Sequence, residues 1–169
     1  ELIRGTNLGY KKSFFYLFNA ANGYDYYAIS DQDDVWQEDK LKIAVSMLEN
    51  QNENGPMLYA STSFLVDENL HIYGCTRKME REISFYNTIV QNICPGHTQV
   101  FNNALLELLK QEIDYDRIYV YDSWITNMSV IYGKIIFDNE SHTLYRQHRG
   151  NQLGSGSGVL GHIYASLKR

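Results

Sequence analysis

Residues 26–36 read Tyr-Tyr-Ala-Ile-Ser-Asp-Gln-Asp-Asp-Val-Trp, a short apolar run that leads directly into three carboxylates. A short, continuous hydrophobic run with polar residues on both sides is typical of a buried strand in a layered sheet. Apolar residues three and four positions apart predict a helix before it, over 9–21, and another after it, over 38–50. The order helix, strand, helix predicts an α/β protein with parallel strands.

The remainder of the chain continues this alternation. Strands are predicted at 57–66, 99–101, 135–137 and 142–145, with a hairpin return at 70–73, and helices at 83–92, 103–112 and 121–132. We therefore expect one domain over 1–169, built as a three-layer α/β/α sandwich around a mostly parallel, mixed sheet. Within it, the glycine-rich residues 147–158 predict a flexible loop, and 159–169 a C-terminal helical segment.

The amino-acid composition excludes several classes of function. The chain has 169 residues, of which 44% are hydrophobic and 21% charged, and this balance fits a single globular domain. A net charge of −5 argues against the basic stripe of a nucleic-acid-binding protein. Two cysteines are too few for a disulfide framework and favour a reducing, intracellular setting. No apolar run is long enough to predict a transmembrane helix.

The acidic turn after the first strand is the strongest candidate site. Asp31, Asp33 and Asp34 would repel one another, and Mg²⁺ or Mn²⁺ would relieve that repulsion while leaving positions open for phosphates. The alternation of side chains predicts Asp31 and Asp33 on one side and Asp34 turned toward the next helix. The alternative is a solvated turn in which Asp34 caps a helix that begins near Trp36.

With three further stretches, this turn resembles the family 2 glycosyltransferases of the GT-A fold, especially the rhamnosyltransferase-like branch of bacterial polysaccharide synthesis. The four stretches are Asn7-Leu8-Gly9-Tyr10 with Phe14, Ile29 to Trp36 with Lys40-Leu41, Tyr121-Asp122-Ser123-Trp124, and Tyr145-Arg146-Gln147-His148 with Asn151. The resemblance implies metal-dependent, inverting transfer of a hexosyl or rhamnosyl group from a dTDP- or UDP-sugar to a saccharide or lipid-linked acceptor. It also implies that a first strand-helix unit of the GT-A fold is missing, so we expect an open sheet edge and an inactive fragment.

The resemblance further implies roles for individual residues. Asp33, Asp31 and His148 would hold Mn²⁺ or Mg²⁺. The donor would contact Asp31, Asn7, Gly9 and Arg146, the last through a planar guanidinium that suits phosphate. The alternatives are an exposed histidine at 148 and a strand-end salt bridge at Arg146.

Inverting transfer also needs a general base and an acceptor site. The resemblance assigns the base to Asp122, whose alternative role is to cap a helix that begins there. The acceptor would lie against Gly96, His97, Thr98 and Trp124, because glycine lets the backbone approach a sugar closely.

Two other classes of function stay open at this stage. One is a glycoside hydrolase that uses Asp33 and Asp122 without a metal. The other is a non-catalytic carbohydrate-binding module whose acidic turns hold Ca²⁺. Convergence of Asp31, Asp33, Asp122 and His148 on one cleft favours the transferase over the module. For the transferase we expect a cytoplasmic protein, with peripheral association at the inner face of the membrane and a homo-oligomer over the open edge as further expectations.

Overall fold

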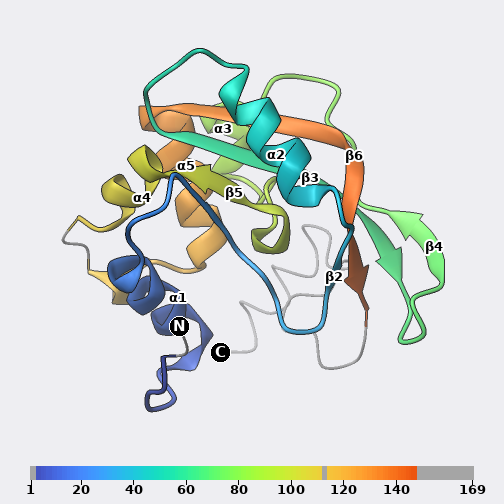
Figure 1. Ribbon diagram of the computed structural model, residues 1–169, viewed down its shortest axis with the longest axis horizontal. Helices are drawn as coiled ribbons and strands as arrows, with labels where there is room; N and C mark the ends of the chain where they lie inside the picture. The colour runs from blue at the N-terminus through green and yellow to red at the C-terminus, as the bar shows by residue number, and fades with distance from the viewer. Residues whose placement is uncertain (1–2, 112–113, 148–169) are drawn as a thin grey trace.

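The computed structural model describes residues 3–111 and 114–147, and Figure 1 shows their arrangement. The helices are α1 (Gly9–Ala20), α2 (Lys40–Glu49), α3 (Phe85–Thr88), α4 (Asn103–Leu109) and α5 (Tyr121–Tyr132), with 3₁₀ turns η1 (Gly96–Thr98) and η2 (Tyr115–Arg117). The strands are β1 (Tyr26–Ala28), β2 (Val35–Trp36), β3 (Met57–Val66), β4 (Ile72–Cys75), β5 (Val100–Asn102) and β6 (Lys134–Arg146).

The sheet is mixed rather than mostly parallel. Its order is β1-β5-β3-β6-β2, and β4 pairs with β3. Among the described residues, only β3 and β6 pair in parallel, and the other four pairings are antiparallel. β1, β3 and β6 do run in one direction, but β5 lies between β1 and β3 and runs the opposite way. The expected parallel order is therefore wrong, because a helix-strand alternation does not fix the direction of a strand that follows a long connection.

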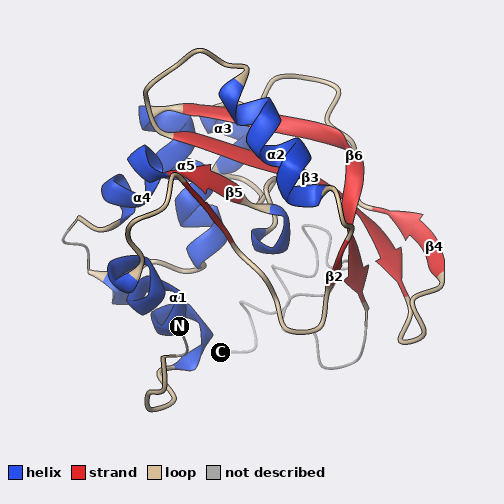
Figure 2. Cartoon of the chain, in the orientation of Figure 1, coloured by secondary structure: helices blue, strands red, loops and turns tan. Residues whose placement is uncertain are grey.

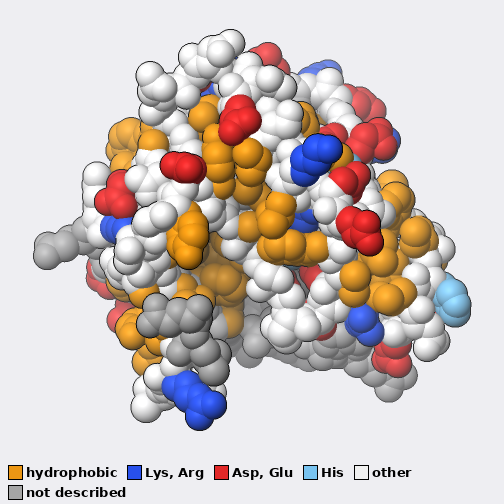
Figure 3. Space-filling view, in the orientation of Figure 1, with side chains coloured by type: hydrophobic (Ala, Val, Ile, Leu, Met, Phe, Trp, Pro, Cys, Tyr) orange, Lys and Arg blue, Asp and Glu red, His pale blue; other side chains and the backbone are white. Residues whose placement is uncertain are grey.

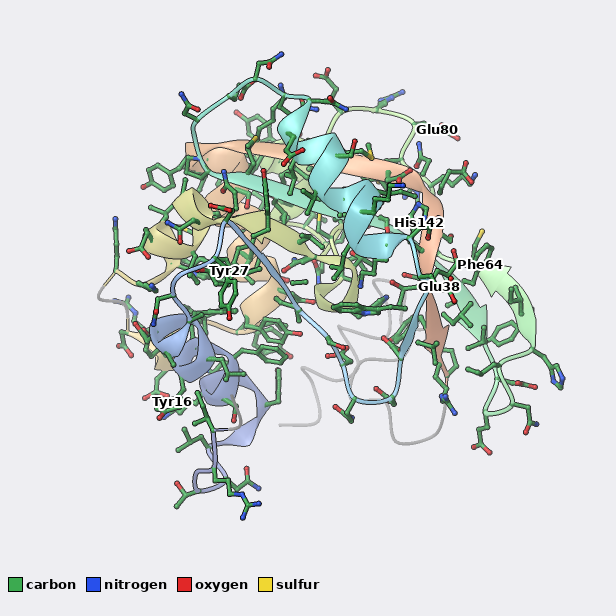
Figure 4. The ribbon with its side chains drawn as sticks, viewed as in Figure 1. Tyr16, Tyr27, Glu38, Phe64, Glu80 and His142 are labelled. Carbon is green, nitrogen blue, oxygen red and sulfur yellow. The ribbon has the colours of Figure 1, made fainter. Side chains whose placement is uncertain are left out.

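The layered arrangement follows from the alternation of side chains along β3. Leu58 and Ala60 face a core formed with α1, α4 and α5, whereas Met57 and Tyr59 face a smaller core under α2. Figure 2 shows α2 on one face of the sheet and α4 and α5 on the other. Tyr27, labelled in Figure 4, belongs to the larger core, where its ring stacks on Phe101 of β5. Helices thus cover both faces of the sheet, as expected.

Several boundaries differ from the sequence-based expectation; the helix predicted at 83–92, for example, is only the short α3. The two closing strands predicted at 135–137 and 142–145 are one continuous strand, β6, which shifts register against β3 near Ser61 and Thr62. No helix begins near Trp36, because residues 35–36 form β2 and pair with β6, so α2 starts only at Lys40. The predicted loop at 147–158, apart from Gln147, and the predicted helix at 159–169 lie outside the described residues.

Close backbone packing explains one glycine in this scaffold. Gly133 ends α5, and a Cβ there would collide with the backbone oxygen of Pro56. The amide of Lys134 donates to that same oxygen at 3.0 Å, so this contact sets the start of β6 against β3. The glycine therefore helps to fix where the parallel pair begins.

The surface carries several open apolar features. β1 pairs only with β5 in the described part of the chain, so its other edge is unpaired, as expected. Figure 3 shows hydrophobic side chains gathered over β4, where Ile72 and Tyr73 are more than half exposed. No helix among the described residues is long and apolar enough to cross a membrane.

Candidate functional site

The acidic turn is a loop between β1 and β2, and the end of β6 holds it in place. Ile29 is its last fully buried residue before the carboxylates. The Arg146 amide donates to Asp34 Oδ1 at 2.9 Å, and Arg146 Nε donates to the backbone oxygen of Asp33 at 2.9 Å. A third bond from Arg146 Nη1 reaches the Glu68 oxygen at 3.0 Å. Arg146 thus shapes the loop, a role that the expected phosphate contact did not anticipate.

Three side chains of this region form a candidate metal site. Asp31, Asp34 and His97 each offer a ligand atom, and these atoms all lie within 4.8 Å of one another. Asp34 therefore belongs to the cluster, and the alternative in which it caps a helix near Trp36 is wrong, because residues 35–36 are a strand. The strand ends at Ala28 and the next begins at Val35, so the alternation used to orient these carboxylates does not extend through the loop.

The cluster differs from the ligand set expected from sequence. Asp31 belongs to it, and so does His97, which we expected at the acceptor. Asp33 is not part of the three-residue set, although its charge raises the pKa of Asp31 and Asp34 and so places it nearby. His148 lies outside the described residues.

His97 is well prepared as a nitrogen ligand. Its Nε2 lies 2.9 Å from Ser63 Oγ, its ring stacks on Tyr145 at 4.3 Å, and burial lowers its pKa to about 3. A neutral ring that donates from Nε2 to Ser63 leaves the Nδ1 lone pair facing Asp34, with Oδ2 of that carboxylate 3.8 Å away. That distance is too long for a hydrogen bond. A hydrogen bond from the second ring nitrogen is the usual support of a metal-bound histidine.

Asp34 supplies the test of whether a cation fits. Its side chain is 1% exposed, and Oδ2 has no hydrogen-bond partner among the described residues. Burial raises the pKa of Asp34 to about 6, although the bond from the Arg146 amide acts in the opposite direction. A buried carboxylate oxygen without a partner is costly, and a shared cation is one way to satisfy it.

A buried lysine balances part of the negative charge. Lys40 is fully buried, and its Nζ donates to the His97 oxygen at 2.6 Å and lies 3.8 Å from the centre of the Trp36 ring. Burial lowers its pKa to about 7, while Asp34 and Asp31 act to raise it. Lys40 had no role in the sequence-based expectation. The signal was its place six residues after Asp34, at the first position of α2.

Asp122 lies beside this cluster at the start of α5. Its Oδ2 accepts from Asn92 Nδ2 at 2.7 Å and from the Gly96 amide at 3.1 Å, and Oδ1 accepts from the Ser123 amide at 2.7 Å. Burial raises the pKa of Asp122, and these bonds partly offset the rise. The charge of Asp122 also raises the pKa of Asp31, so Asp31, Asp33 and Asp122 converge on one region.

Tyr121 packs this region tightly. Its ring stacks on Phe14 of α1 at 3.8 Å, and Tyr10 meets its edge at 6.4 Å. A Cβ at Gly96 would collide with the Tyr121 hydroxyl. Gly96 is thus required by a neighbouring ring, and its expected contact with the acceptor sugar stays a prediction.

Four other expected residues make local contacts. Asn7 Oδ1 accepts from the Gly9 amide at 2.9 Å, and Gly9 has a left-handed φ of 74°. Neither residue shares a hydrogen bond or ion pair with the acid cluster within the described residues, so their donor role stays a prediction. Thr98 is buried and donates to the Pro95 oxygen at 2.8 Å. Trp124 lines a cavity with Ser123 and Asn127, and its expected contact with the acceptor stays a prediction.

Comparison with known proteins shows a distant similarity to a sugar-transfer enzyme. The chain is 28% identical over 160 residues to "dTDP-rhamnosyl transferase RfbG" of Shigella flexneri, and the aligned part covers 87% of this chain and 52% of that protein. The chain thus spans about half the length of this relative. No family profile matches the chain, and no solved structure matches it. The similarity supports a glycosyltransferase-like relationship.

Proposed function

We propose that the chain carries the transfer centre of a metal-dependent, inverting glycosyltransferase that acts in bacterial surface polysaccharide synthesis. The observation that carries the proposal is the placement of Asp122 beside a cluster of Asp31, Asp34 and His97. Similarity to a dTDP-rhamnosyl transferase supports the same class of reaction. A histidine in the cluster favours a metal site over a metal-free hydrolase with two carboxylates, and a second buried acid beside that site favours catalysis over a passive module.

Asp31, Asp34 and His97 would hold the metal in this proposal. Carboxylates alone suit Mg²⁺, whereas an imidazole nitrogen in the set favours a transition metal, so we propose Mn²⁺ ahead of Mg²⁺. When bound, the metal would neutralise charge that develops on the departing diphosphate. Lys40, whose pKa burial lowers to about 7, places a titratable positive group behind the carboxylates, and its protonated form would limit their mutual repulsion before the metal arrives.

Asp122 would act as the general base. The acceptor hydroxyl oxygen bonds to the anomeric carbon on the face opposite the diphosphate, and the bond from that carbon to the diphosphate oxygen breaks. The hydroxyl proton passes to a carboxylate oxygen of Asp122. Each carboxylate oxygen has two acceptor sites, and so Oδ1, with one bond to the Ser123 amide, keeps a site for this proton. A raised pKa brings the base closer to the operating pH, where general bases act best.

The partners follow from the same chemistry. We propose a dTDP- or UDP-sugar as donor and a saccharide or lipid-linked acceptor at the inner face of the cell membrane. The open edge of β1 would allow a homo-oligomer or a further segment to complete the sheet.

Metal binding tests the proposal directly. We expect Mn²⁺ to bind the chain in electron paramagnetic resonance titrations, and Asp34→Asn or His97→Gln to weaken binding at least about tenfold, because each removes one ligand from a three-residue set. Asp116→Asn is the matched control, since Asp116 is an exposed acid that pairs with Lys12 at 2.9 Å. Added dTDP should tighten Mn²⁺ binding to the wild type. Equal affinity in Asp34→Asn and Asp116→Asn would contradict the metal site.

A further inference from the structure

Four large apolar side chains stand out from the surface at α3 and the turn after it. Phe85 and Tyr86 are 43% and 80% exposed, and Ile89 and Val90 are 56% and 74% exposed. The spacing of four residues between the two pairs puts all four side chains on one side of the helical turn. Single exposed apolar residues are normal on a protein surface, whereas a contiguous group marks an interaction surface. We call these four side chains the α3 patch.

The fold holds the α3 patch outward. Thr88, on the other side of the turn, is buried, and its hydroxyl donates to the Phe85 oxygen at 2.9 Å. Met79 and Ile83, in the loop before α3, pack against the larger core. The Met79 amide also donates to Asn139 Oδ1 at 2.7 Å. The loop and the helical turn are therefore both anchored, so the patch turns inward only if these contacts break.

Basic side chains border the α3 patch. The preceding loop, which Glu80 marks in Figure 4, carries five exposed charged residues: Arg77, Lys78, Glu80, Arg81 and Glu82. This loop is net positive in a chain whose net charge is −5. Lys78 is partly neutralised by Glu140, because its Nζ lies 3.7 Å from a carboxylate oxygen of that residue. The two arginines thus supply most of the positive charge beside the patch.

The α3 patch lies close to the proposed base. α3 packs against α5, on the face of the sheet opposite α2 (Figure 2). Asn92 follows Val90 by two residues, and its Nδ2 donates to Asp122 Oδ2 at 2.7 Å. Two residues of chain span at most about 7 Å, so the patch ends within that distance of the residue that contacts the base. A partner seated on the patch would therefore lie beside the transfer centre.

We propose that the α3 patch, with Arg77 and Arg81, docks on the surface of an anionic lipid bilayer. Aliphatic and aromatic side chains beside basic ones are the combination that binds the interface of such a bilayer. Four apolar side chains on one short turn fall well short of the about 20–30 residues a side of a stable protein interface. A fluid bilayer needs no matching groove. That the bilayer carries the acceptor rests on the proposed function, whereas docking itself does not.

Vesicle sedimentation measures the docking. The 169-residue chain, without metal or nucleotide, is mixed with vesicles of phosphatidylcholine alone or of equal parts phosphatidylcholine and phosphatidylglycerol. We expect saturable binding to the mixed vesicles. Tyr86→Ser combined with Val90→Ser should weaken it at least about tenfold, because less apolar area is buried. Arg77→Gln combined with Arg81→Gln should weaken it about tenfold on the mixed vesicles, and should leave any binding to phosphatidylcholine alone unchanged.

Two tyrosines elsewhere on the surface serve as matched controls. Tyr24, before β1, is 74% exposed, and Tyr73, in β4, is 61% exposed. Tyr24→Ser and Tyr73→Ser should both bind vesicles as the wild type does. If Tyr73→Ser weakens binding more than the change at Tyr86 and Val90, the bilayer meets the β4 surface and the α3 patch is not the docking site.

Three other results would overturn the proposal. They are no saturable binding to the mixed vesicles, equal affinity of the wild type and both double variants, and self-association through the patch in place of vesicle binding. Light scattering of the chain without vesicles detects the last of these. If the variant at Tyr86 and Val90 fails to fold, the exposed pair Arg77 and Arg81 still decides the outcome. Mn²⁺ titration of the same samples keeps the two proposals apart: absent vesicle binding with normal Mn²⁺ binding refutes only the docking, and the reverse result refutes only the metal-dependent transfer.

Discussion

Replacement of Gly96 by alanine tests how the loop before β5 is fitted against α5. A Cβ at this position would lie 3.0 Å from Tyr121 Cζ and 3.2 Å from Cε2, and would collide with the hydroxyl. The ring cannot simply turn away, because Phe14 stacks on it at 3.8 Å and Tyr121 is only 6% exposed. The backbone cannot move freely either, since the Gly96 amide donates to Asp122 Oδ2.

The expected cost follows from these contacts. Overpacking in a filled interior costs about 1–3 kcal/mol, and a hydrogen bond to a charged group is worth about 1.5–3 kcal/mol when it is lost entirely. If the chain relieves the collision partly by overpacking and partly by weakening the Gly96–Asp122 hydrogen bond, the free energy of unfolding falls by about 3 kcal/mol. For a domain of this size, that lowers Tm by about 6–12 °C.

A double-mutant cycle identifies the cause. Tyr121→Phe removes the hydroxyl but leaves the two ring contacts, so Gly96→Ala should cost about 1 kcal/mol less in that background. Urea unfolding of the wild type, both single variants and the double variant measures this coupling. If Gly96→Ala costs the same in both backgrounds, the collision with the Tyr121 hydroxyl is not what requires glycine at this position.

Two further predictions concern the charges of the site. Burial lowers the pKa of Lys40 to about 7, so between pH 7 and the usual lysine pKa the unfolded chain binds more protons than the folded chain. The free energy of unfolding of the wild type, measured against that of Lys40→Met by urea titration, should therefore rise from pH 7 to pH 9. If the difference in unfolding free energy between the two proteins does not change with pH, the Lys40 ammonium is not desolvated. Asn92→Leu removes a 2.7 Å bond to the Asp122 carboxylate, so the pKa of Asp122 should rise further, as followed by carbon-13 NMR of its carboxyl group. An unchanged or lower pKa would mean that Asn92 does not stabilise the charged form.

The sequence alone determined where several of the helices and strands lie along the chain. Hydrophobic periodicity predicted β3 over 57–66 and α5 over 121–132 with the bounds that the structure has, and it placed the acidic loop after the first strand. These features depend on contacts between near neighbours along the chain, and the repeat of 2.0 or 3.6 residues records them directly. The carboxylates of the candidate site were recognisable for the same reason.

Only the tertiary structure decided how these elements meet. The antiparallel placement of β5 beside β3 depends on how a long connection returns to the sheet, which no local pattern records. The choice of Asp34 over Asp33 in the three-residue cluster depends on Arg146, which lies 112 residues away and fixes the loop through its backbone amide. His97 and Lys40 enter the same site because η1 and α2 meet there, with Lys40 Nζ bonded to the His97 oxygen. Periodicity cannot show which distant side chains share a buried space, because that depends on packing between elements and on the cost of leaving buried charges unpaired.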